Sequence, residues 1–200
     1  MINKILAIII LLSINVFVAS AQNYGRELKD INELSLKLKK AGEKTNSIIC
    51  DFKQTKNMKV LAKPAISKGT FTYKESEIRL DYIIPSGDYI YLSEDKFKIS
   101  NNGKTTIITS KSNPMLKHLR AMLNSCMTGD LTKLQQGGKI DYFYNNNSYV
   151  LVINSNSKLS NYLQKIVLIF DSADMTLNSM QMCENETDYT LYEFFNKKIN

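Results

Sequence analysis

The feature that most constrains this chain is an alternation of apolar and polar residues that runs through positions 47–91. A period of two places alternate side chains on opposite faces of a β-strand. Three successive segments show this period, and each therefore predicts a strand with one apolar face and one charged face. Such strands are typical of an antiparallel sheet with one apolar surface. The positions on the apolar side are Ile48, Cys50, Phe52 and Gln54, then Gly69, Phe71 and Tyr73, then Ile78, Leu80 and Tyr82.

The first 21 residues differ from the rest of the chain. Lys4 is their only charge, an apolar run covers 5–12 and continues over 14–18, and Ala19-Ser20-Ala21 provides small residues at a cleavage position. This pattern predicts a secretory signal peptide at 1–21, with an uncleaved membrane anchor as the alternative. Since no cysteine directly follows the apolar run, a lipid-modified N-terminus is not expected. The mature chain is expected to be exported and soluble.

The length of 200 residues and the 44% hydrophobic content fit one globular domain over residues 22–200. The formal net charge is +7, but the lysines are spread along the chain apart from a group at 37–44. A nucleic-acid-binding protein would gather them on one face with aromatic residues. We therefore interpret them as solvated faces, with a transient contact to an anionic membrane surface as the alternative.

The residues that could carry catalysis or bind a metal are few. Cys50, Cys126 and Cys183 are too far apart for a zinc motif; one pair could form a disulfide in an oxidising compartment, although packing of Cys50 as a small apolar residue is favoured. His118 is the only histidine, and no GxSxG or HExxH motif occurs. The sequence therefore predicts a protein that is not an enzyme and needs no cofactor or metal.

The order of the predicted elements is a helix, five or six strands, a helical insertion and about five more strands. Apolar residues at helical spacing predict the first helix at 24–41, with Gly42 as its end. The insertion covers 115–135, after Asn113-Pro114. Asn102-Gly103 predicts a hairpin, and residues 145–147 predict another. The remaining strands are expected at 89–92, 97–99, 105–109, 140–144, 148–153, 163–170, 176–183 and 189–195.

A large sheet with an apolar face must cover that face or close on itself. The two helical regions are the available cover, and they are short for a sheet of about ten strands. We expect an apolar hollow between sheet and helices, with complete packing as the alternative. The predicted lining is Cys50, Phe52, Phe71, Tyr73, Ile78, Leu80, Tyr82, Tyr89 and Tyr91, and the predicted lid residues are Met115, Leu119, Met122 and Leu123.

These segments together resemble a known family. The signal peptide, the helix before the first strand and the helical insertion in mid-sheet are similar in LolA, the periplasmic carriers of outer-membrane lipoproteins. The resemblance covers nearly all of the mature chain. It rests on the motifs Phe52-x-Gln54, Gly69-x-Phe71, Ile78-Arg79-Leu80-x-Tyr82 with Pro85, and Tyr189-x-Leu191-Tyr192-x-Phe194.

The resemblance implies a mainly β fold with helices (α+β): a single curved antiparallel sheet of about 10–11 strands, forming an unclosed half β-barrel covered by a helical lid. It implies a monomeric periplasmic protein of a Gram-negative bacterium, without catalysis, that holds acyl chains in its cavity. Such a carrier receives lipoproteins from an inner-membrane ABC transporter and passes them to an outer-membrane receptor. The alternatives are a carrier of another lipid or glycolipid, and a sensor or interaction module of the same fold.

One feature departs from the family pattern. The family has an arginine in the turn between its second and third strands, which holds the lid closed. Here that turn reads Lys74-Glu75-Ser76-Glu77. Lys74 and Arg79 are the candidate replacements, although the alternation places Arg79 on the polar face of its strand.

Overall fold

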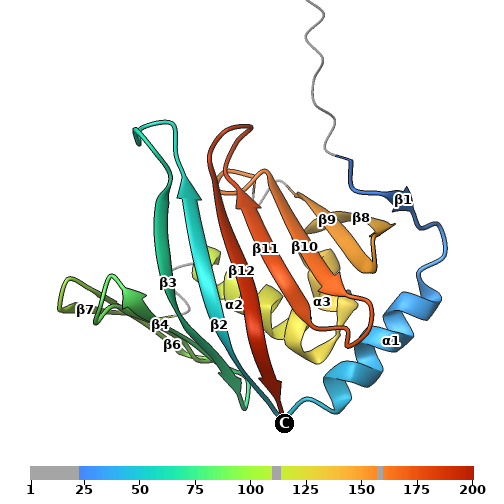
Figure 1. The fold of residues 1–200 in the computed structure, drawn as a ribbon, viewed down its shortest axis with the longest axis horizontal. Coiled ribbons are helices and arrows are strands. Elements are labelled where there is room, and N and C mark those ends of the chain that lie inside the picture. The colour runs from blue at the N-terminus through green and yellow to red at the C-terminus, as the bar shows by residue number, and fades with distance from the viewer. Residues whose placement is uncertain (1–22, 110–113, 157–159) are drawn as a thin grey trace, which may run out of the picture.

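The computed structural model describes residues 23–109, 114–156 and 160–200, so the predicted signal peptide lies outside the described residues. One antiparallel sheet of 12 strands forms most of the molecule, and three α-helices lie against it (Figure 1). The prediction of a mainly β fold with a single curved, unclosed antiparallel sheet is confirmed, with one strand more than expected. The strands are β1 Arg26–Glu27, β2 Ser47–Asn57, β3 Ala65–Lys74, β4 Glu77–Ile84, β5 Tyr89–Leu92, β6 Lys96–Asn101, β7 Lys104–Thr109, β8 Gly138–Asn145, β9 Ser148–Ser155, β10 Lys165–Asp171, β11 Leu177–Cys183 and β12 Tyr189–Ile199.

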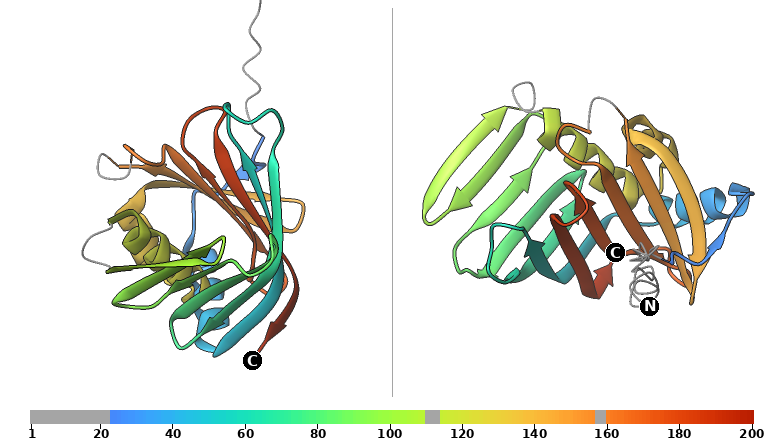
Figure 2. Two further views of the ribbon diagram at one scale, coloured as in Figure 1. Left: turned by 90° about the vertical axis from the view of Figure 1, so that its left-hand side faces the viewer. Right: turned by 90° about the horizontal axis from the view of Figure 1, so that it is seen from above.

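The sheet has the strand order β1-β8-β9-β10-β11-β12-β2-β3-β4-β5-β6-β7. Two runs of sequential hairpins, β2 to β7 and β8 to β12, are joined where β12 pairs with β2. The edge strands β1 and β7 are not paired with each other, so the barrel stays open. The right-handed twist of the strands curves the sheet, and its concave side surrounds the helices (Figure 2).

The helices are α1 Asn32–Glu43, α2 Pro114–Thr128 and α3 Leu131–Leu134, followed by the 3₁₀ turn η1 Gln135–Gly137. All lie on the concave side of the sheet, with α1 across one end (Figures 1 and 2). The helical insertion predicted at 115–135 is therefore confirmed. No helix in the described part of the chain is both long and apolar enough to cross a membrane.

The predicted start of the first helix is wrong. Residues 26–27 form β1, which pairs with Phe143 and Tyr144 of β8, and α1 begins only at Asn32. Gly25 has φ +102°, a conformation that turns the chain out of a helix. The Asp30 carboxylate then accepts a hydrogen bond from the Asn32 backbone N–H at 2.9 Å, which starts the helix there.

Gly42 does not end α1, which continues to Glu43. Its role is contact: a Cβ atom at Gly42 would lie 2.1 Å from the Thr128 carbonyl oxygen in α2. Gly129, just after α2, has φ +69° and would place a Cβ atom 2.0 Å from the Leu38 carbonyl oxygen. The two helices therefore touch backbone to backbone at their C-terminal ends.

The predicted hairpins are confirmed by the turn conformations. Asn102 and Gly103 have φ +52° and +74°, and Asn146 and Asn147 have φ +44° and +64°. Two successive residues with positive φ are typical of the tight turns that match strand twist. These turns fix the pairing of β6 with β7 and of β8 with β9.

The concave face of the sheet and the helices bury one continuous apolar core. A smaller cluster lies on the other face of the sheet, where Val150, Val152 and Val167 are covered by Tyr24 and Phe143. The rings of Tyr24 and Phe143 are 5.5 Å apart, so the segment before β1 is held against the outside of β8. All three cysteines are buried and unpaired.

Candidate functional site

The apolar residues of β2, β3 and β4 line up in rows across the concave face, which we call the inner face. The first row is Ile48, Tyr73 and Ile78, and the second is Cys50, Phe71 and Leu80. The third is Phe52, Gly69 and Tyr82. In the first two rows every residue is buried, as is Phe52 in the third, so these residues lie on the inner face.

Gly69 explains how the third row packs. A Cβ atom there would lie 1.9 Å from the Asp81 carbonyl oxygen and 2.8 Å from the Phe52 ring. Without a side chain at this point, the Phe52 ring can lie across β3 and contact Tyr82 edge to face, with the ring centroids 5.2 Å apart. The family motif Gly69-x-Phe71 therefore has a packing reason.

Strand β12 contributes two inner-face aromatic residues that the sequence prediction missed. Phe194 pairs with Phe52 and contacts the Phe71 ring at 5.2 Å between centroids. Tyr192 pairs with Gln54, whose side-chain amide donates a hydrogen bond to the Tyr192 hydroxyl at 2.7 Å. Burial raises the pKa of Tyr192 well above its ordinary value. The alternation in 189–195 predicts that Tyr192 and Phe194 share one face of a strand. Only the pairing of β12 with β2 shows that this face is the inner face.

The predicted inner-face positions of Tyr89 and Tyr91 are wrong. In the pairing of β4 with β5, Tyr91 lies opposite Arg79 and Tyr89 lies opposite Asp81. Directly opposed residues share a face, so both tyrosines lie on the outer, polar face. There the Arg79 guanidinium stacks on the Tyr89 ring at 4.6 Å. Hydrogen bonding to Asp81 is the main cause that raises the pKa of Arg79 above its ordinary value.

The buried faces of the helices close the inner face. From the predicted lid, Met122 and Leu123 are buried in α2, together with Cys126 and Met127. Leu34 and Leu38 of α1 and Leu131 and Leu134 of α3 complete this apolar cover. Met115 and Leu119 fall within α2, but their side chains lie outside the described residues.

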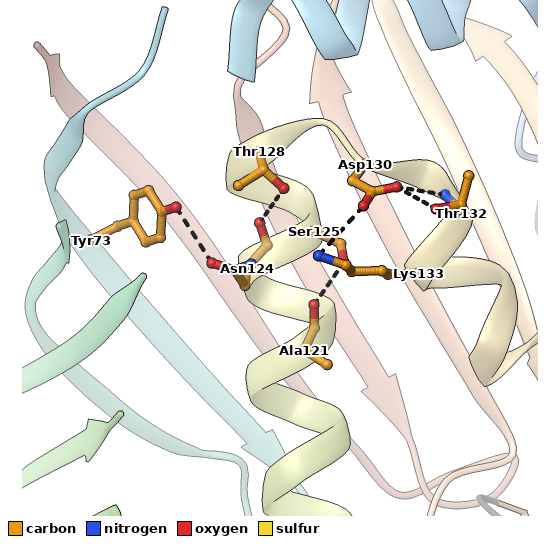
Figure 3. A network of polar contacts seen from close by, with 8 residues as sticks. All are labelled: Tyr73, Ala121, Asn124, Ser125, Thr128, Asp130, Thr132 and Lys133. Carbon is orange, nitrogen blue, oxygen red and sulfur yellow. Dashed lines mark hydrogen bonds and ion pairs between the residues drawn. The ribbon is translucent and has the colours of Figure 1, made fainter. Parts of the chain in front are cut away.

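The polar contacts between this lid and the sheet are long. The Tyr73 hydroxyl donates to the Asn124 side-chain oxygen in α2 at 3.4 Å (Figure 3). At the other end of the sheet, the Lys37 ammonium of α1 donates to the Tyr149 hydroxyl at 3.5 Å. By contrast, the hydrogen bonds inside α2, such as Ser125 hydroxyl to Ala121 carbonyl at 2.7 Å, are short. Among the described residues, the polar contacts from the helices to the sheet are thus longer than those within α2.

The residue that reaches from the lid to the turn after β3 is Arg120. Its Nη2 donates to the Ser76 carbonyl oxygen at 3.4 Å, and its Nε is buried without a hydrogen-bond partner among the described residues. The two predicted latch residues are engaged elsewhere. Arg79 forms two 2.7 Å hydrogen bonds with Asp81 on the outer face, and Lys74 lies 3.6 Å from the neighbouring Glu75 carboxylate. The prediction of Arg79 or Lys74 as the latch is wrong.

Among the described residues, β2, β3 and β12 pack closely against α2 around Phe71. A cavity of about 10 Å³ lies between β2, β3, β12 and α2, lined in part by Cys50, Phe71, Met127 and Phe194. That volume accommodates about one water molecule and no acyl chain. Within the described residues no group of three or more metal-ligating side chains occurs. The site therefore offers apolar contact area rather than fixed polar geometry.

Comparison with known proteins identifies a family and solved structures that are similar to this chain. A family model described as "Outer membrane lipoprotein carrier protein LolA" matches residues 43–200. Among solved structures, an uncharacterized conserved protein from Thermus thermophilus has a TM-score of 0.53 at 8% identity, covering 86% of this chain and 88% of that one. The MucA/MucB complex structure from Pseudomonas aeruginosa has a TM-score of 0.50 at 11% identity, covering 82% of this chain and 55% of that one.

The structural likenesses show the shared fold, and the family model adds a match in sequence over most of the chain. A search of curated proteins found no match. The region matched by the family model begins in the last turn of α1 and includes β2, β3, β4, the helical insertion and β12. These are the elements that build the inner face and its lid, and the chain belongs to the LolA family.

Proposed function

We propose that this protein binds the acyl chains of lipoproteins between its inner face and its helical lid. In this role it would carry them through the periplasm from the inner to the outer membrane. The observation that supports the proposal is the combination of a broad aromatic surface with a cover that is almost entirely apolar and held by long hydrogen bonds. A cover of this kind can be displaced without breaking a strong polar network.

The energetics suit a carrier. Burying one CH₂ group gains about 0.8 kcal/mol, so two or three chains would give a gross gain on the order of tens of kcal/mol. Displacement of the lid and the ordering of the chains must offset most of this gain, or the cargo could not be released. A lid packed on the same apolar residues that the cargo would contact provides this offset, because binding exchanges one apolar contact for another.

The cavity between Phe71, Phe194 and Met127 is too small for an acyl chain, so α2 must move before a chain can reach these residues. Gly42 packs against the backbone of α2, and Gly129 packs against the backbone of α1, so the two helices are joined at their C-terminal ends. Arg120, nearer the other end of α2, forms one 3.4 Å hydrogen bond to Ser76. We therefore expect α2 to swing outward at its N-terminal end. The donor would be an inner-membrane ABC transporter and the acceptor an outer-membrane receptor, as in the family. No catalytic step is proposed.

The proposal is tested by titrating the purified mature protein with a fluorescent acyl probe. We expect saturable binding, and we expect Phe71→Glu to weaken it by about tenfold or more, because a charge on the inner face opposes burial of hydrocarbon. Thr72→Glu is the matched control, since Thr72 is the next residue of β3 and shares the outer face with Arg79. That variant should bind the probe as the native protein does.

Absence of saturable binding by the native protein would refute the carrier function. Equal binding by Phe71→Glu would show that the chains lie elsewhere. Because Phe71 is buried, a second variant, Tyr82→Glu, places the charge at a partly exposed position of the same face in case the first does not fold. Mass spectrometry of lipid extracted from natively purified protein then separates lipoprotein acyl chains from another lipid cargo.

A further inference from the structure

A second cavity, of about 320 Å³, lies at one end of the molecule and opens to solvent. We call it the end cleft. It is formed by the C-terminal ends of α1 and α2, the start of β2, the turn between β10 and β11, and the end of β12, near the C-terminus in Figure 1. Its apolar lining includes Leu38, Ala41, Cys126, Met127, Met175 and Leu177.

The end cleft adjoins the small cavity on the inner face. Both are lined by Ile48, Met127, Thr176 and Leu177. The inner cavity continues from these shared residues to Phe71 and Phe194. An apolar path therefore leads from the surface, past the joined ends of the helices, to the aromatic residues of the inner face.

Positive charge is placed along this path. Lys40 and Lys44 of α1 line the end cleft, and Lys197 lines the inner cavity. Asp174 is the acidic residue of the cleft lining, and its carboxylate already accepts hydrogen bonds from the Thr176 backbone N–H and hydroxyl at 2.8 and 2.6 Å. The lining thus has an excess of positive charge above an apolar floor.

Lys197 points into the molecule because of a bulge in β12. The register of the pairing between β12 and β2 shifts between Phe195 and Lys198, and Asn196 has φ +54°. The Lys197 ammonium donates hydrogen bonds to the Thr176 hydroxyl at 2.8 Å and to the Asn178 side-chain oxygen. An ammonium has three donors, so these two partners leave one N–H for a ligand oxygen. Burial lowers the pKa of Lys197 from its ordinary value, while Asp174 and Asp171 oppose this change.

We infer that the end cleft is a binding site for a single-chain amphiphile with an anionic head group, a carboxylate or a phosphate. The head group would accept a hydrogen bond from Lys197 beside Thr176, where the two cavities adjoin. The chain would lie in the end cleft along Leu38, Met127 and Met175, because the inner cavity has no room for it. This inference goes beyond the proposed function, because the acyl chains of lipoproteins are held by esters and amides. An acyl chain that is held by an ester or an amide has no charge at this position, so Lys197 selects for a free acid or a phosphate.

The test uses dansyl-undecanoic acid and its methyl ester, which share a chain and differ in charge. We expect the native protein to bind the acid about tenfold more tightly than the ester, since hydrogen bonds to charged groups exceed neutral ones. Lys197→Met should remove this preference: the affinity for the acid should fall about tenfold, and the affinity for the ester should stay unchanged. Lys197→Arg should retain most of it. Titration with a dansyl-alkyl phosphate then shows whether the site binds a phosphate head group as well as a carboxylate.

Lys53→Met is the matched control, because Lys53 is a partly exposed lysine of the sheet whose ammonium pairs with Glu193 at 2.8 Å, away from the cleft. It should keep the preference for the acid. Equal affinity of the native protein for acid and ester would overturn the anionic site while leaving the acyl carrier intact, and this ratio needs no variant. A preference for the acid that persists in Lys197→Met would also overturn the site. Failure of the native protein to bind either probe would refute the carrier function as well.

Discussion

At the scale of single residues, Gly42 shows how contact can override helix propensity. In an isolated helix, an alanine in place of glycine is more favourable by about 1 kcal/mol. Gly42 lies inside α1, yet a Cβ atom there would meet the Thr128 carbonyl oxygen at 2.1 Å. That oxygen is backbone, so it can move only if α1 and α2 separate.

We therefore expect Gly42→Ala to lower the free energy of unfolding by about 2 kcal/mol, as overpacking does, despite the gain in helix propensity. Urea denaturation measures it. Gly87→Ala is the control: Gly87 has φ +91°, and apart from its chain neighbours no atom lies within 4 Å of the position that the added methyl group would take. Gly87→Ala should therefore lower the free energy of unfolding only by the backbone strain of about 1 kcal/mol. A Gly42→Ala variant as stable as the native protein would show that the helices do not touch there.

The buried thiol of Cys50 gives a pH dependence. Burial raises the pKa of Cys50 to about 12, while Lys197 lowers it and Asp51 raises it further. Between the ordinary value of 9.0 and about 12, the folded state holds a proton that the unfolded state has lost. The contribution of this thiol to the free energy of unfolding is therefore fully present below pH 9.0 and falls as the pH rises, by at most about 1.4 kcal/mol per pH unit.

We expect Cys50→Val to flatten the fall in stability between about pH 8 and pH 10.5. The comparison with the native protein at each pH cancels the contributions of Cys183 and Tyr82, whose pKa values burial also raises. Urea denaturation series at several pH values measure the two curves. Parallel curves would mean that Cys50 is as accessible to water in the folded state as in the unfolded state.

At the scale of elements, the lid helix α2 has unequal ends. Its C-terminal end is packed against α1 through Gly42 and Gly129, and Met127 reaches the inner face. Toward its N-terminal end, the described polar contact with the sheet is the one from Arg120 to Ser76. Within the described residues, the two ends of α2 are therefore held by different kinds of contact.

Arg120→Met keeps an apolar stem but removes the hydrogen bond to Ser76. We expect amide hydrogen exchange in the N-terminal half of α2 to become about fivefold faster, since a long hydrogen bond contributes about 1 kcal/mol. Lys117→Met is the matched control on the same helix, because Lys117 is exposed. Exchange that is equally fast in the native protein and in Arg120→Met would mean that other contacts hold this end.

The strands differ in how far the sequence alone can predict them. In β2, β3 and β4, most apolar residues occupy one face, and the exceptions such as Ile49 and Ile83 are exposed, so the local pattern is enough to place Phe52 and Phe71. In β5, Tyr-Ile-Tyr-Leu has apolar residues on both faces, and the pairing of Tyr91 with Arg79 decides which side faces inward. The face of a strand with apolar residues on both sides depends on its neighbour, which the local pattern does not contain.

The same limit applies to the two cations of the candidate site. Lys197 follows an alternation that the bulge at Asn196 breaks, so the sequence pattern does not indicate that it turns inward. Arg120 and Ser76 belong to a helix and a turn that are brought together only by the folded sheet. The Asn102-Gly103 hairpin, in contrast, was predictable because its turn conformation depends on two adjacent residues.

At the scale of the whole molecule, one curved sheet separates two kinds of surface. The inner face is aromatic and covered by helices, whereas the outer face has charged residues over β2, β3 and β4 and the small valine cluster under Tyr24. The pairing of β12 with β2 joins the two halves of the sheet, and the inner-face residues Phe194 and Phe52 meet at this junction. A chain bound there would contact both halves at once.

The most direct measurement of this account is photo-labelling with an acylated lipopeptide that has a diazirine near the end of its acyl chain. Mass spectrometry of the digested protein then locates the labels. We predict labels on peptides that contain Phe71, Phe194 and Met127, from β3, β12 and α2, and a loss of these labels when excess unlabelled lipopeptide is present. Labels confined to the outer-face residues of β4 and β5, or labelling that unlabelled lipopeptide does not reduce, would contradict the claim that the inner face holds the acyl chain.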